Sequence, residues 1–457
     1  MDLVELLTRP EGKTLEFKRD LSSPDGVIKS VVAFANTAGG ILLVGVEDRS
    51  RRVRGVNDPL ALEERLASLI ADRVQPILVP DLEILPWRDT HVLSAEIHPS
   101  PARPHHVKAL GREQGVFIRI GSTNRRADTT LIDELRRFAR NQSFDEEPIP
   151  ELSSEALDFR AASELFAERR RLRREDLRTL RLTLEYQGRQ VLTMGGMILF
   201  GKDRLTHFPD AWIQVGRFEG SDRRRILDTS ELRSYPPIAI EEAIAFVRRN
   251  TTREIVIEGA KRVDRYAYPL EAVREAVVNS VVHADYSQRG APIRLSIFDD
   301  RMEIENPGLL PFGLTIEEIR GGVSKLRNRV IGRVFNELGL IEQWGSGIQR
   351  MTAACEQAGL APPTLEEVAT HFRVTLFSAR EAAPRVDEVD KVILEALRRG
   401  NGLSTAEIAG RVGRSARATR ARLQSLMDRG LVVVVGSGPN DPRRVYFPAG
   451  GGTRIRS

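Results

Sequence analysis

The sequence predicts a multidomain protein of the mixed α/β (α+β) class. Its 457 residues exceed what one hydrophobic core normally supports, so we expect three or four domains. Apolar helical patterns alternate with short strand-like runs over most of the chain, whereas the C-terminal part predicts three helices followed by a hairpin. A hydrophobic content of 41% with 29% charged residues is typical of a globular protein.

The N-terminal part contains four short motifs: Leu15-Glu-Phe-Lys18, Ala33-Phe-Ala-Asn-Thr-Ala-Gly-Gly40, Gly45-Val-Glu-Asp48 and Phe117-Ile-Arg-Ile-Gly-Ser-Thr123. Their order and spacing resemble the Schlafen AlbA-type (AlbA_2) domain, which we place at residues 1–142. The resemblance implies a nucleic-acid-binding module. Clustered lysines and arginines supply sequence-independent affinity for phosphates. The alternative role of these charges is to keep a solvated edge of the domain from aggregating. The candidate phosphate contacts are Lys18, Arg51, Arg52, Arg54, Arg119, Asn124, Arg125 and Arg126.

A second interpretation of the same domain is enzymatic. Glu11, Glu16 and Lys18 are closely spaced, and Asp48 follows a strand. Carboxylates around a divalent metal with a nearby lysine suit phosphodiester hydrolysis. Some Schlafen proteins are similar here, and in those proteins the carboxylates bind a divalent metal for cleavage of RNA or DNA. The resemblance implies the same activity as an alternative for this domain. A metal-dependent nuclease gated by ATP is therefore the alternative function.

Residues 143–249 are expected to connect the recognised modules as a region of helices and strands. An acidic, proline-containing hinge at Glu146-Glu-Pro-Ile-Pro-Glu151 marks its start. A charged helix is expected at residues 157–174. No motif in this region points to chemistry.

The segment Arg274-Glu-Ala-Val-Val-Asn-Ser-Val-Val-His283 predicts an apolar helix with one polar row. Glu275, Asn279 and His283 follow each other at i, i+4 steps, which places them on one face. The asparagine offers a neutral oxygen to Mg²⁺, and the glutamate can activate or orient water as an ATPase base. The row therefore predicts a nucleotide site with Asn279 as the metal ligand, although a solvated polar stripe is the plain alternative.

Two later motifs favour the nucleotide site. Glu305-Asn-Pro-Gly308 follows a predicted hairpin, and Gly345-Ser-Gly347 opens a helix whose first N–H groups can approach phosphate. Together with Glu275-x-x-x-Asn279 they resemble the gyrase–histidine-kinase–MutL (GHKL) ATP-binding class, in the form found at the C-terminus of RecG-like regulators, over residues 250–380. The resemblance implies an α/β sandwich that binds ATP and Mg²⁺. Pro307 interrupts the first glycine box, so Asp300 and Glu305 are both candidates for the carboxylate that reads adenine.

Between these boxes, residues 321–329 combine a glycine pair with Lys325, Arg327 and Arg329. A mobile basic loop over a nucleotide would place cations against phosphate. We therefore predict a lid, with a solvated surface loop as the alternative. The candidate nucleotide contacts of the whole domain are Asn279, His283, Asp300, Glu305, Gly308, Lys325, Arg327, Gly345, Ser346 and Gly347.

Residues 385–448 predict a winged helix-turn-helix. Ser404-Thr-Ala-Glu407 is a capping box that opens the second helix. After the third helix, Leu431-Val-Val-Val-Val435 and Arg443-Arg-Val-Tyr-Phe447 are expected to form a two-stranded wing. A recognition helix enters the major groove while a basic wing meets the backbone. The alternative is a protein-contact or dimerisation module. The candidate DNA contacts are Arg414, Arg417, Arg420, Arg422, Arg443 and Arg444.

The combined prediction is an ATP-responsive, DNA-binding transcriptional regulator, with RNA as an alternative ligand and a scaffold with an inactive nucleotide fold as a third hypothesis. The formal net charge of +5 agrees with nucleic-acid partners, but the clustering of arginine carries more weight. The single cysteine, Cys355, excludes an intrachain disulfide. Neither a signal peptide nor a spanning apolar run is recognised, so we expect a cytoplasmic protein without a membrane partner. We also expect a homo-oligomer.

Overall fold

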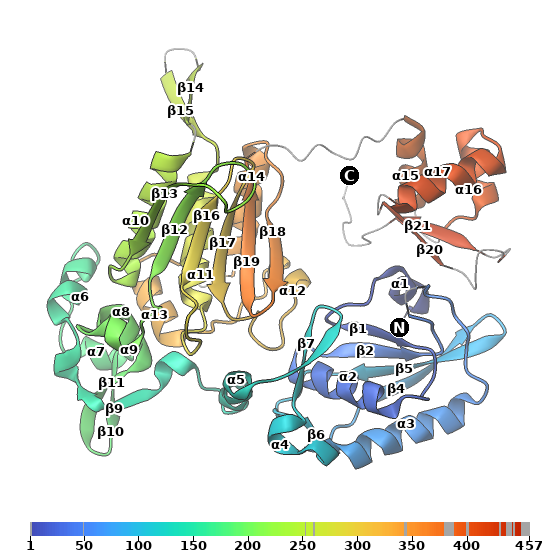
Figure 1. The fold of residues 1–457 in the computed structure, drawn as a ribbon, viewed down its shortest axis with the longest axis horizontal. Coiled ribbons are helices and arrows are strands. Elements are labelled where there is room, and N and C mark those ends of the chain that lie inside the picture. Colours follow the sequence, from blue (N-terminus) through green and yellow to red (C-terminus); the bar gives the residue numbers. More distant parts are fainter. Residues whose placement is uncertain are drawn as a thin grey trace. The chain divides into compact units, whose positions relative to one another are not determined.

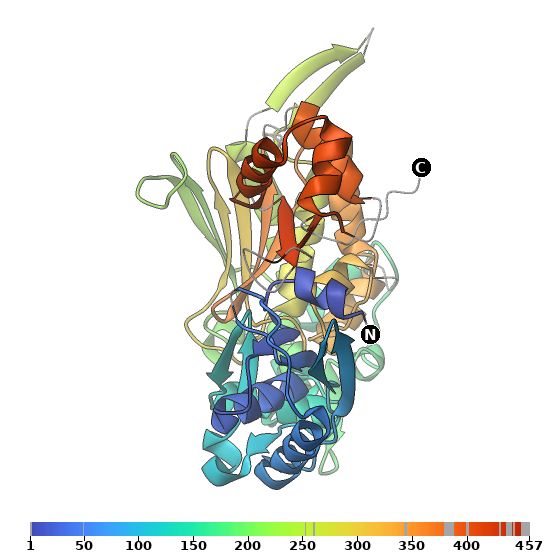
Figure 2. The same ribbon diagram turned by 90° about the vertical axis from the view of Figure 1, so that its right-hand side faces the viewer.

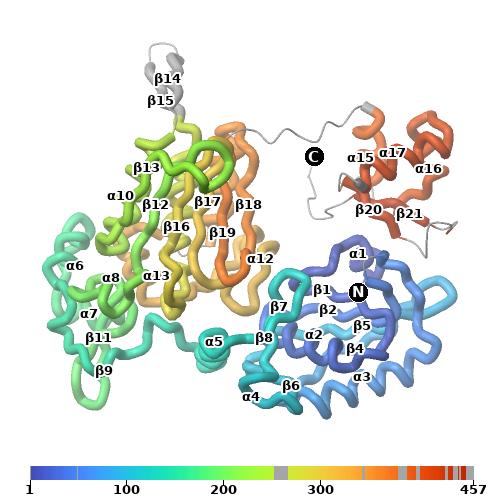
Figure 3. Tube along the Cα trace, viewed as in Figure 1, coloured from blue at the N-terminus to red at the C-terminus, as the bar shows by residue number. Residues whose placement is uncertain are grey.

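The computed structural model describes residues 2–48, 50–251, 253–258, 261–341, 345–378, 388–398, 402–428, 431–435, 441 and 444–448 (Figure 3). The chain divides into two compact units. One contains residues 1–132 and 382–457, and the other contains residues 133–381 (Figure 1). None of the described helices combines the length and the apolar character that a bilayer crossing requires.

The N-terminal domain is built on a four-stranded sheet with the order β1-β2-β5-β4. The strands are β1 (Leu15–Lys18), β2 (Gly40–Val44), β4 (Asp81–Trp87) and β5 (Thr90–Ile97), and β1 and β2 are parallel. Helices α2 (Pro24–Asn36) and α3 (Pro59–Arg73) pack on this sheet. The smaller elements are α1 (Leu3–Thr8), β3 (Val74–Gln75), β6 (His106–Val107), α4 (Gly111–Gln114), β7 (Phe117–Ile120) and β8 (Thr123–Arg126).

A buried asparagine holds β7 and the residue before β6 against α2. The side chain of Asn36, at the end of α2, donates to the carbonyl oxygens of His105 and Phe117 at 2.8 and 2.9 Å. Its own oxygen accepts from the His105 N–H at 2.7 Å. Three satisfied bonds from one buried amide fix β7 against α2, because an unpaired polar group at this position would be costly.

The C-terminal segment folds as predicted. It has helices α15 (Glu388–Arg398), α16 (Thr405–Val412) and α17 (Ala416–Asp428), and the hairpin β20 (Val432–Val435) and β21 (Val445–Pro448). The predicted capping box is present: the Ser404 N–H donates to Glu407 at 2.7 Å, and the Glu407 N–H donates to Ser404 Oγ at 3.3 Å. Gly413 ends α16 with φ 63°, a left-handed conformation that favours glycine.

The second unit is dominated by a six-stranded sheet with the order β13-β12-β16-β17-β19-β18 (Figures 1 and 2). Its strands are β12 (Ile213–Phe218), β13 (Ile226–Leu232), β16 (Ile293–Ile297), β17 (Arg301–Pro307), β18 (Thr364–Val368) and β19 (His371–Phe377). One face is apolar and carries α10 (Pro236–Asn250) and α11 (Leu270–His283), and α14 (Gly347–Gln357) packs on α11. The described part of this unit also contains β14 (Arg253–Glu258), β15 (Lys261–Tyr266) and α12 (Ile316–Arg320).

The region expected to be a connector belongs to this unit. The three-stranded sheet β10-β11-β9 and its helices share one buried apolar cluster with the six-stranded sheet, and β12 and β13 are strands of that sheet. The boundary placed at residue 249 therefore falls inside a continuous core. The elements are α5 (Thr129–Ala139), which leads into the unit, β9 (Pro148–Ser153), α6 (Phe159–Phe166), α7 (Asp176–Thr179), β10 (Thr183–Tyr186), β11 (Arg189–Thr193), α8 (Met194–Phe200) and α9 (Arg204–His207).

The charged helix expected at residues 157–174 is shorter than predicted. It ends as α6 at Phe166. Arg170, in the turn that follows, pairs with Asp176 and Glu337 at 2.8 and 2.7 Å. Tertiary ion pairs therefore override the helical propensity of the arginine run, since such propensities are small.

Asp145 fixes the start of α13 (Arg329–Glu337). Its carboxylate accepts the backbone N–H groups of Arg329, Val330 and Ile331 at 3.0, 2.7 and 3.0 Å. These are the first N–H groups of the helix, which have no partner inside it. A negative charge at this end also favours the helix dipole.

We expect Asp145→Ala to lower the free energy of unfolding by about 2 kcal/mol, because three buried donors lose their acceptor. Urea denaturation measures the change. The matched control is Asp133→Ala, whose exposed carboxylate pairs with Arg136 at 2.9 Å and should contribute less than about 0.5 kcal/mol. Equal stability of the two variants would contradict the capping role.

Candidate functional site

The polar row of α11 lines a cavity. Glu275, Asn279 and His283 all contribute to the wall of a hollow of about 120 Å³. Ile304 and Asn306 of β17 form the sheet side, and residues of the lid and of the first turn of α14 close the rest. Three residues that are four apart in sequence thus face one space, as the helical spacing predicted.

The carboxylate of Glu275 is held from two sides. Asn279 Nδ2 donates to Oε1 at 3.1 Å, and Arg350 Nη2 donates to Oε2 at 3.0 Å. Only 8% of Glu275 is exposed, and Arg350 lies one turn into α14 and also lines the cavity. The role of Arg350 was not predicted, because this residue stands in an ordinary amphipathic pattern. The one indication in the sequence is that it follows Gly347 by three residues, which places it about one turn further along the same helix.

The two glycines before and at the start of α14 are required by close contacts. A side chain at Gly347 would overlap the Glu275 carboxylate. Gly345 has φ 68°, and a Cβ there would lie 2.6 Å from the Gly322 carbonyl oxygen. Both line the cavity, as does Ile348, so backbone at the positive end of α14 borders it. Ser346 is the N-cap residue and makes no side-chain cap bond. Glu342, Gln343 and Trp344 lie outside the described residues.

His283 is a neutral group at the far end of the row. Burial, and then the positive charge of Arg327, lower the pKa of its imidazole to about 4. A neutral imidazole near pH 7 can accept or donate one hydrogen bond toward the cavity, depending on its tautomer.

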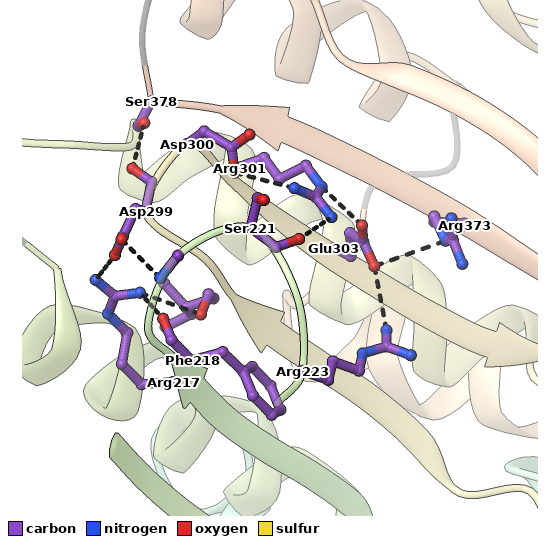
Figure 4. A network of polar contacts seen from close by, with 12 residues as sticks. Arg217, Phe218, Ser221, Arg223, Asp299, Asp300, Arg301, Glu303, Arg373 and Ser378 are labelled. Atoms are coloured by element: carbon purple, nitrogen blue, oxygen red, sulfur yellow. Dashed lines mark hydrogen bonds and ion pairs between the residues drawn. The ribbon is translucent and has the colours of Figure 1, made fainter. Parts of the chain in front are cut away.

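The carboxylates expected to read adenine do not line the cavity. Asp300 lies exposed in the turn between β16 and β17, where it pairs with Arg301 at 3.0 Å (Figure 4). Glu305 points to the opposite face of the sheet, where Arg373 and Arg223 contact it at 2.6 and 3.4 Å. Successive side chains of a strand alternate between faces, so the neighbour Asn306 reaches the cavity instead. This placement corrects both expectations.

The polar face that carries Glu305 is internally neutralised. Glu303 binds Arg301 at 2.8 Å and Arg223 at 3.1 Å, and Arg373 lies 4.0 Å away (Figure 4). The arginines lower the pKa of Glu305, although its burial acts in the opposite direction. Glu305 therefore stabilises the sheet through ion pairs with these arginines and is not free to recognise a base in the cavity.

The predicted lid divides into an anchored end and a loosely held part. Lys325 lines the cavity together with Val323, Ser324 and Leu326. Arg327 does not line this cavity: its guanidinium pairs with Glu134 and donates to the Leu309 carbonyl. This corrects its assignment as a phosphate contact. Gly308 has φ 100°, and a Cβ there would lie 2.9 Å from Asp285 Cβ and 3.2 Å from Arg327 Cζ, so the glycine allows both side chains to pack closely.

In the N-terminal domain, Glu16 belongs to a buried charge cluster. Its carboxylate pairs with Arg119 and Lys18 and accepts from Ser30 Oγ at 3.0 Å. Arg119 is 1% exposed, and it also donates to the Asn124 side chain at 2.9 Å. Arg119 is therefore a structural cation, which corrects its assignment as a phosphate contact.

The other carboxylates of the proposed nuclease site form a pair. Glu11 accepts the Phe17 N–H at 2.6 Å and hydrogen-bonds Asp48. Burial, and the nearby Asp48, raise the pKa of Glu11. Within the described part of the chain, no group of three or more His, Cys, Asp or Glu side chains is arranged to hold a metal. Because Glu16 is already neutralised by Arg119, the three carboxylates do not present one open ligand set.

The remaining basic candidates differ in exposure. Arg125 and Arg126 are exposed on β8. Arg54 is exposed but pairs with Glu47 at 2.7 Å, whereas Arg51 is half-buried, with φ 51°, and donates to the Thr8 carbonyl. Arg52 is also half-buried.

The third helix of the winged domain presents most of its predicted arginines. Arg417 and Arg420 are exposed on α17, and Arg414 is exposed just before the helix begins. Arg422 instead pairs with Asp390 of α15 at 2.7 Å and holds the domain together. Arg444 stacks on Tyr446 at 5.3 Å, and Arg443 lies outside the described residues.

The low pKa of His283 predicts a pH-dependent stability. The unfolded chain takes up a proton below about pH 6.5, whereas the folded protein resists it until about pH 4. The contribution of His283 to the free energy of unfolding should therefore be constant above about pH 7 and should fall by up to about 3 kcal/mol as the pH drops from 6.5 to 4. Urea denaturation at a series of pH values measures this slope. His283→Gln should flatten it and the exposed His98→Gln should not; equal slopes in all three proteins would refute the assignment.

Comparisons with solved structures find similar chains. The DIP2311 protein from Corynebacterium diphtheriae is 21% identical, with 95% of this chain and 92% of that chain covered and a TM-score of 0.44. The N-terminal domain of a RecG-related protein from Nitrosomonas europaea, described as a putative ATP-dependent DNA helicase, is 29% identical. It covers 27% of this chain and 90% of its own length, with a TM-score of 0.23. A comparison with curated proteins finds no match.

Three family models match consecutive segments. Residues 11–128 match the family described as "Schlafen, AlbA_2", and residues 290–376 match "Putative ATP-dependent DNA helicase recG C-terminal". Residues 386–433 match "Winged helix-turn-helix DNA-binding". Their order confirms the predicted architecture. The chain therefore joins an N-terminal Schlafen AlbA_2 domain, a central ATPase-like domain of the recG C-terminal family and a C-terminal winged helix-turn-helix.

Proposed function

We propose that this protein is a regulator in which binding of ATP with Mg²⁺ to the α11 cavity changes the association of the winged helix with DNA. The observation that carries the proposal is the convergence of Glu275, Asn279 and the glycine-rich start of α14 on one cavity. An amide oxygen for Mg²⁺ and helix N–H groups for phosphate stand on adjoining walls.

The residues present fit such a ligand. Asn279 would contribute an oxygen to Mg²⁺, and Lys325 and Arg350 are the cations in the cavity wall that could meet phosphate. Glu275 would orient water if ATP is hydrolysed, provided that Arg350 exchanges the carboxylate for phosphate oxygens. Bound Mg²⁺–ATP supplies the charge that makes this exchange favourable.

The cavity must expand to admit ATP. Its volume of about 120 Å³ is below the roughly 300 to 1,000 Å³ of typical small-molecule sites. The wall that can yield is residues 323–326, which have no helix or strand assignment and expose 46% of Val323 and 41% of Leu326. We infer that these residues form the lid. Because ATP binds one lid position better than the other, it can shift the protein between two states.

The N-terminal domain is proposed to add sequence-independent contacts to nucleic acid through Arg125 and Arg126, which are exposed together. The nuclease alternative is less well supported, because the Glu16 carboxylate is occupied by Arg119 and Lys18. We further propose that the protein acts in the cytoplasm as a homo-oligomer.

Replacing the metal ligand tests ATP binding. Asn279→Ala removes the amide oxygen, so the Kd for ATP in the presence of Mg²⁺ should rise at least about tenfold, or about 1.4 kcal/mol. Isothermal titration measures it. The control is Glu271→Gln on the exposed side of the same helix, which should bind like the wild type. Unchanged ATP affinity in Asn279→Ala, or no binding to the wild type, would reject the site.

A second experiment tests coupling to DNA. Fluorescence anisotropy with a DNA duplex should show a change in Kd of about fivefold or more when Mg²⁺–ATP is added to the wild type, and no change in Asn279→Ala. A DNA affinity that is the same with and without ATP in the wild type would disprove the regulatory coupling.

The DNA contacts of the winged helix are tested separately. Arg417→Ala with Arg420→Ala should weaken DNA binding by about tenfold or more and reduce its salt dependence, because two exposed phosphate-binding cations are lost. The control is Arg160→Ala, an 88% exposed arginine on α6.

A further inference from the structure

A second, larger cavity adjoins the lid. It encloses about 1110 Å³ between α5, α13 and the segment that ends in Arg329. Glu275, Asn279 and His283 are not part of its wall, so it is distinct from the nucleotide cavity. Ser324, Lys325 and Leu326 of the lid line both spaces, together with Pro311 and Ile341. The lid is therefore part of the wall that the two cavities share.

The second cavity has an excess of positive charge. Its wall contains three carboxylates, and each is already engaged. Glu134 pairs with Arg327, and Glu337 pairs with Arg170, which is not part of the wall. Asp285 accepts from Ser287 Oγ at 2.6 Å and from Gln288 Nε2 at 3.0 Å. None of these bonds neutralises the other lining cations, which are Arg137, Lys325, Arg329 and Arg333.

These four cations are held at the wall by weak or neutral partners. Arg333 donates to the Thr179 carbonyl at 3.0 Å, and Lys325 Nζ lies 3.5 Å from the Gly313 carbonyl. Arg329 donates to Asn141 and lies 3.6 Å from Glu146 outside the wall, and Arg137 lies 3.8 Å from Glu147. Arg329 and Arg333 are one helical turn apart, so their side chains lie on one face of α13.

Aromatic rings form part of the same wall. Phe138, Phe144 and Phe312 line it, and Arg137 and Lys325 lie over the rings of Phe144 and Phe138 at 5.4 and 5.8 Å. An apolar wall lowers the local dielectric constant and strengthens the attraction between these cations and an anion. Guanidinium planes and aromatic rings together also suit a nucleobase.

We propose that this second cavity binds the phosphate groups of a nucleotide or of a single-stranded nucleic acid, and that this ligand opposes ATP. The opposition follows from the shared wall and rests on the proposed ATP site. To enlarge the nucleotide cavity, residues 324–326 must move away from α11, which is toward the second cavity. A ligand that fills the second cavity and contacts Lys325 holds the lid against the nucleotide cavity, so the two ligands exclude each other.

Direct binding is tested first, without ATP. The probes are inorganic triphosphate, uridine monophosphate and an oligothymidylate of eight nucleotides, each titrated into the full chain. Arg333→Gln should weaken binding of the recognised probe at least fivefold, and Arg333→Glu should weaken it further, because this exposed arginine can be replaced without disturbing an ion pair. The exposed Arg160→Gln should bind like the wild type. Preference for the free phosphates or for the oligothymidylate identifies the source of the phosphate.

If both Arg333 variants retain the wild-type affinity for every probe, the second site is refuted, whatever ATP does. The competition is tested next. A saturating concentration of the recognised probe should raise the apparent Kd for ATP at least fivefold in the wild type and have no such effect in Arg333→Glu. Independent binding of probe and ATP would overturn the exclusion. Failure of ATP to bind wild type alone would instead reject the proposed function, and the direct titration would still decide on the second site.

Discussion

The contact between α11 and the first turn of α14 sets the geometry of the central domain. The Glu275 carboxylate lies where a side chain at Gly347 would be, and Arg350 holds its other oxygen at 3.0 Å. The glycine is needed because the two helices approach so closely. The arginine is needed because a carboxylate that is 8% exposed requires a positive partner. The cavity, its polar wall and the approach of helix N–H groups all follow from this one contact.

A second buried pair determines which part of the lid can move. Arg327 is tied to Glu134 and to the Leu309 carbonyl, and Asn328 donates to the carbonyl oxygens of Val282 and Ala284 at 2.8 and 2.7 Å. The Asn328 bonds satisfy carbonyl groups at the end of α11, which have no partner inside that helix. The segment 321–329 is therefore anchored at its C-terminal end. In the proposed lid, residues 323–326 are the part left to move, and Ser324, Lys325 and Leu326 of that part line both cavities.

Charge in this protein is divided between structural and exposed arginines. Arg119, Arg327 and Arg422 pair with acidic side chains inside their domains, whereas Arg125, Arg417 and Arg420 are exposed. The side chains of Arg119 and Arg327 are buried, and a buried arginine without its carboxylate would be strongly destabilising, so these two are not available to an external phosphate. The exposed group carries the sequence-independent attraction to nucleic acid that the two flanking domains are expected to provide.

Local sequence patterns by themselves determined several helices and the polar row of the candidate site. Helical spacing placed Glu275, Asn279 and His283 on one face, and the capping box at Ser404 located α16, because both depend on residues within one or two helical turns. Motif order along the chain also determined the three-domain architecture.

The tertiary structure decided what depends on partners distant in sequence. It turned Glu305 away from the cavity and Asn306 toward it, because strand pairing selects the face and a shift of one residue reverses it. It paired Arg327 with Glu134, which is 193 residues away, and Arg119 with Glu16. It also merged the presumed connector with the central sheet. No local pattern encodes such pairings, because the charge of an arginine is the same in sequence whether its partner is a carboxylate or a phosphate.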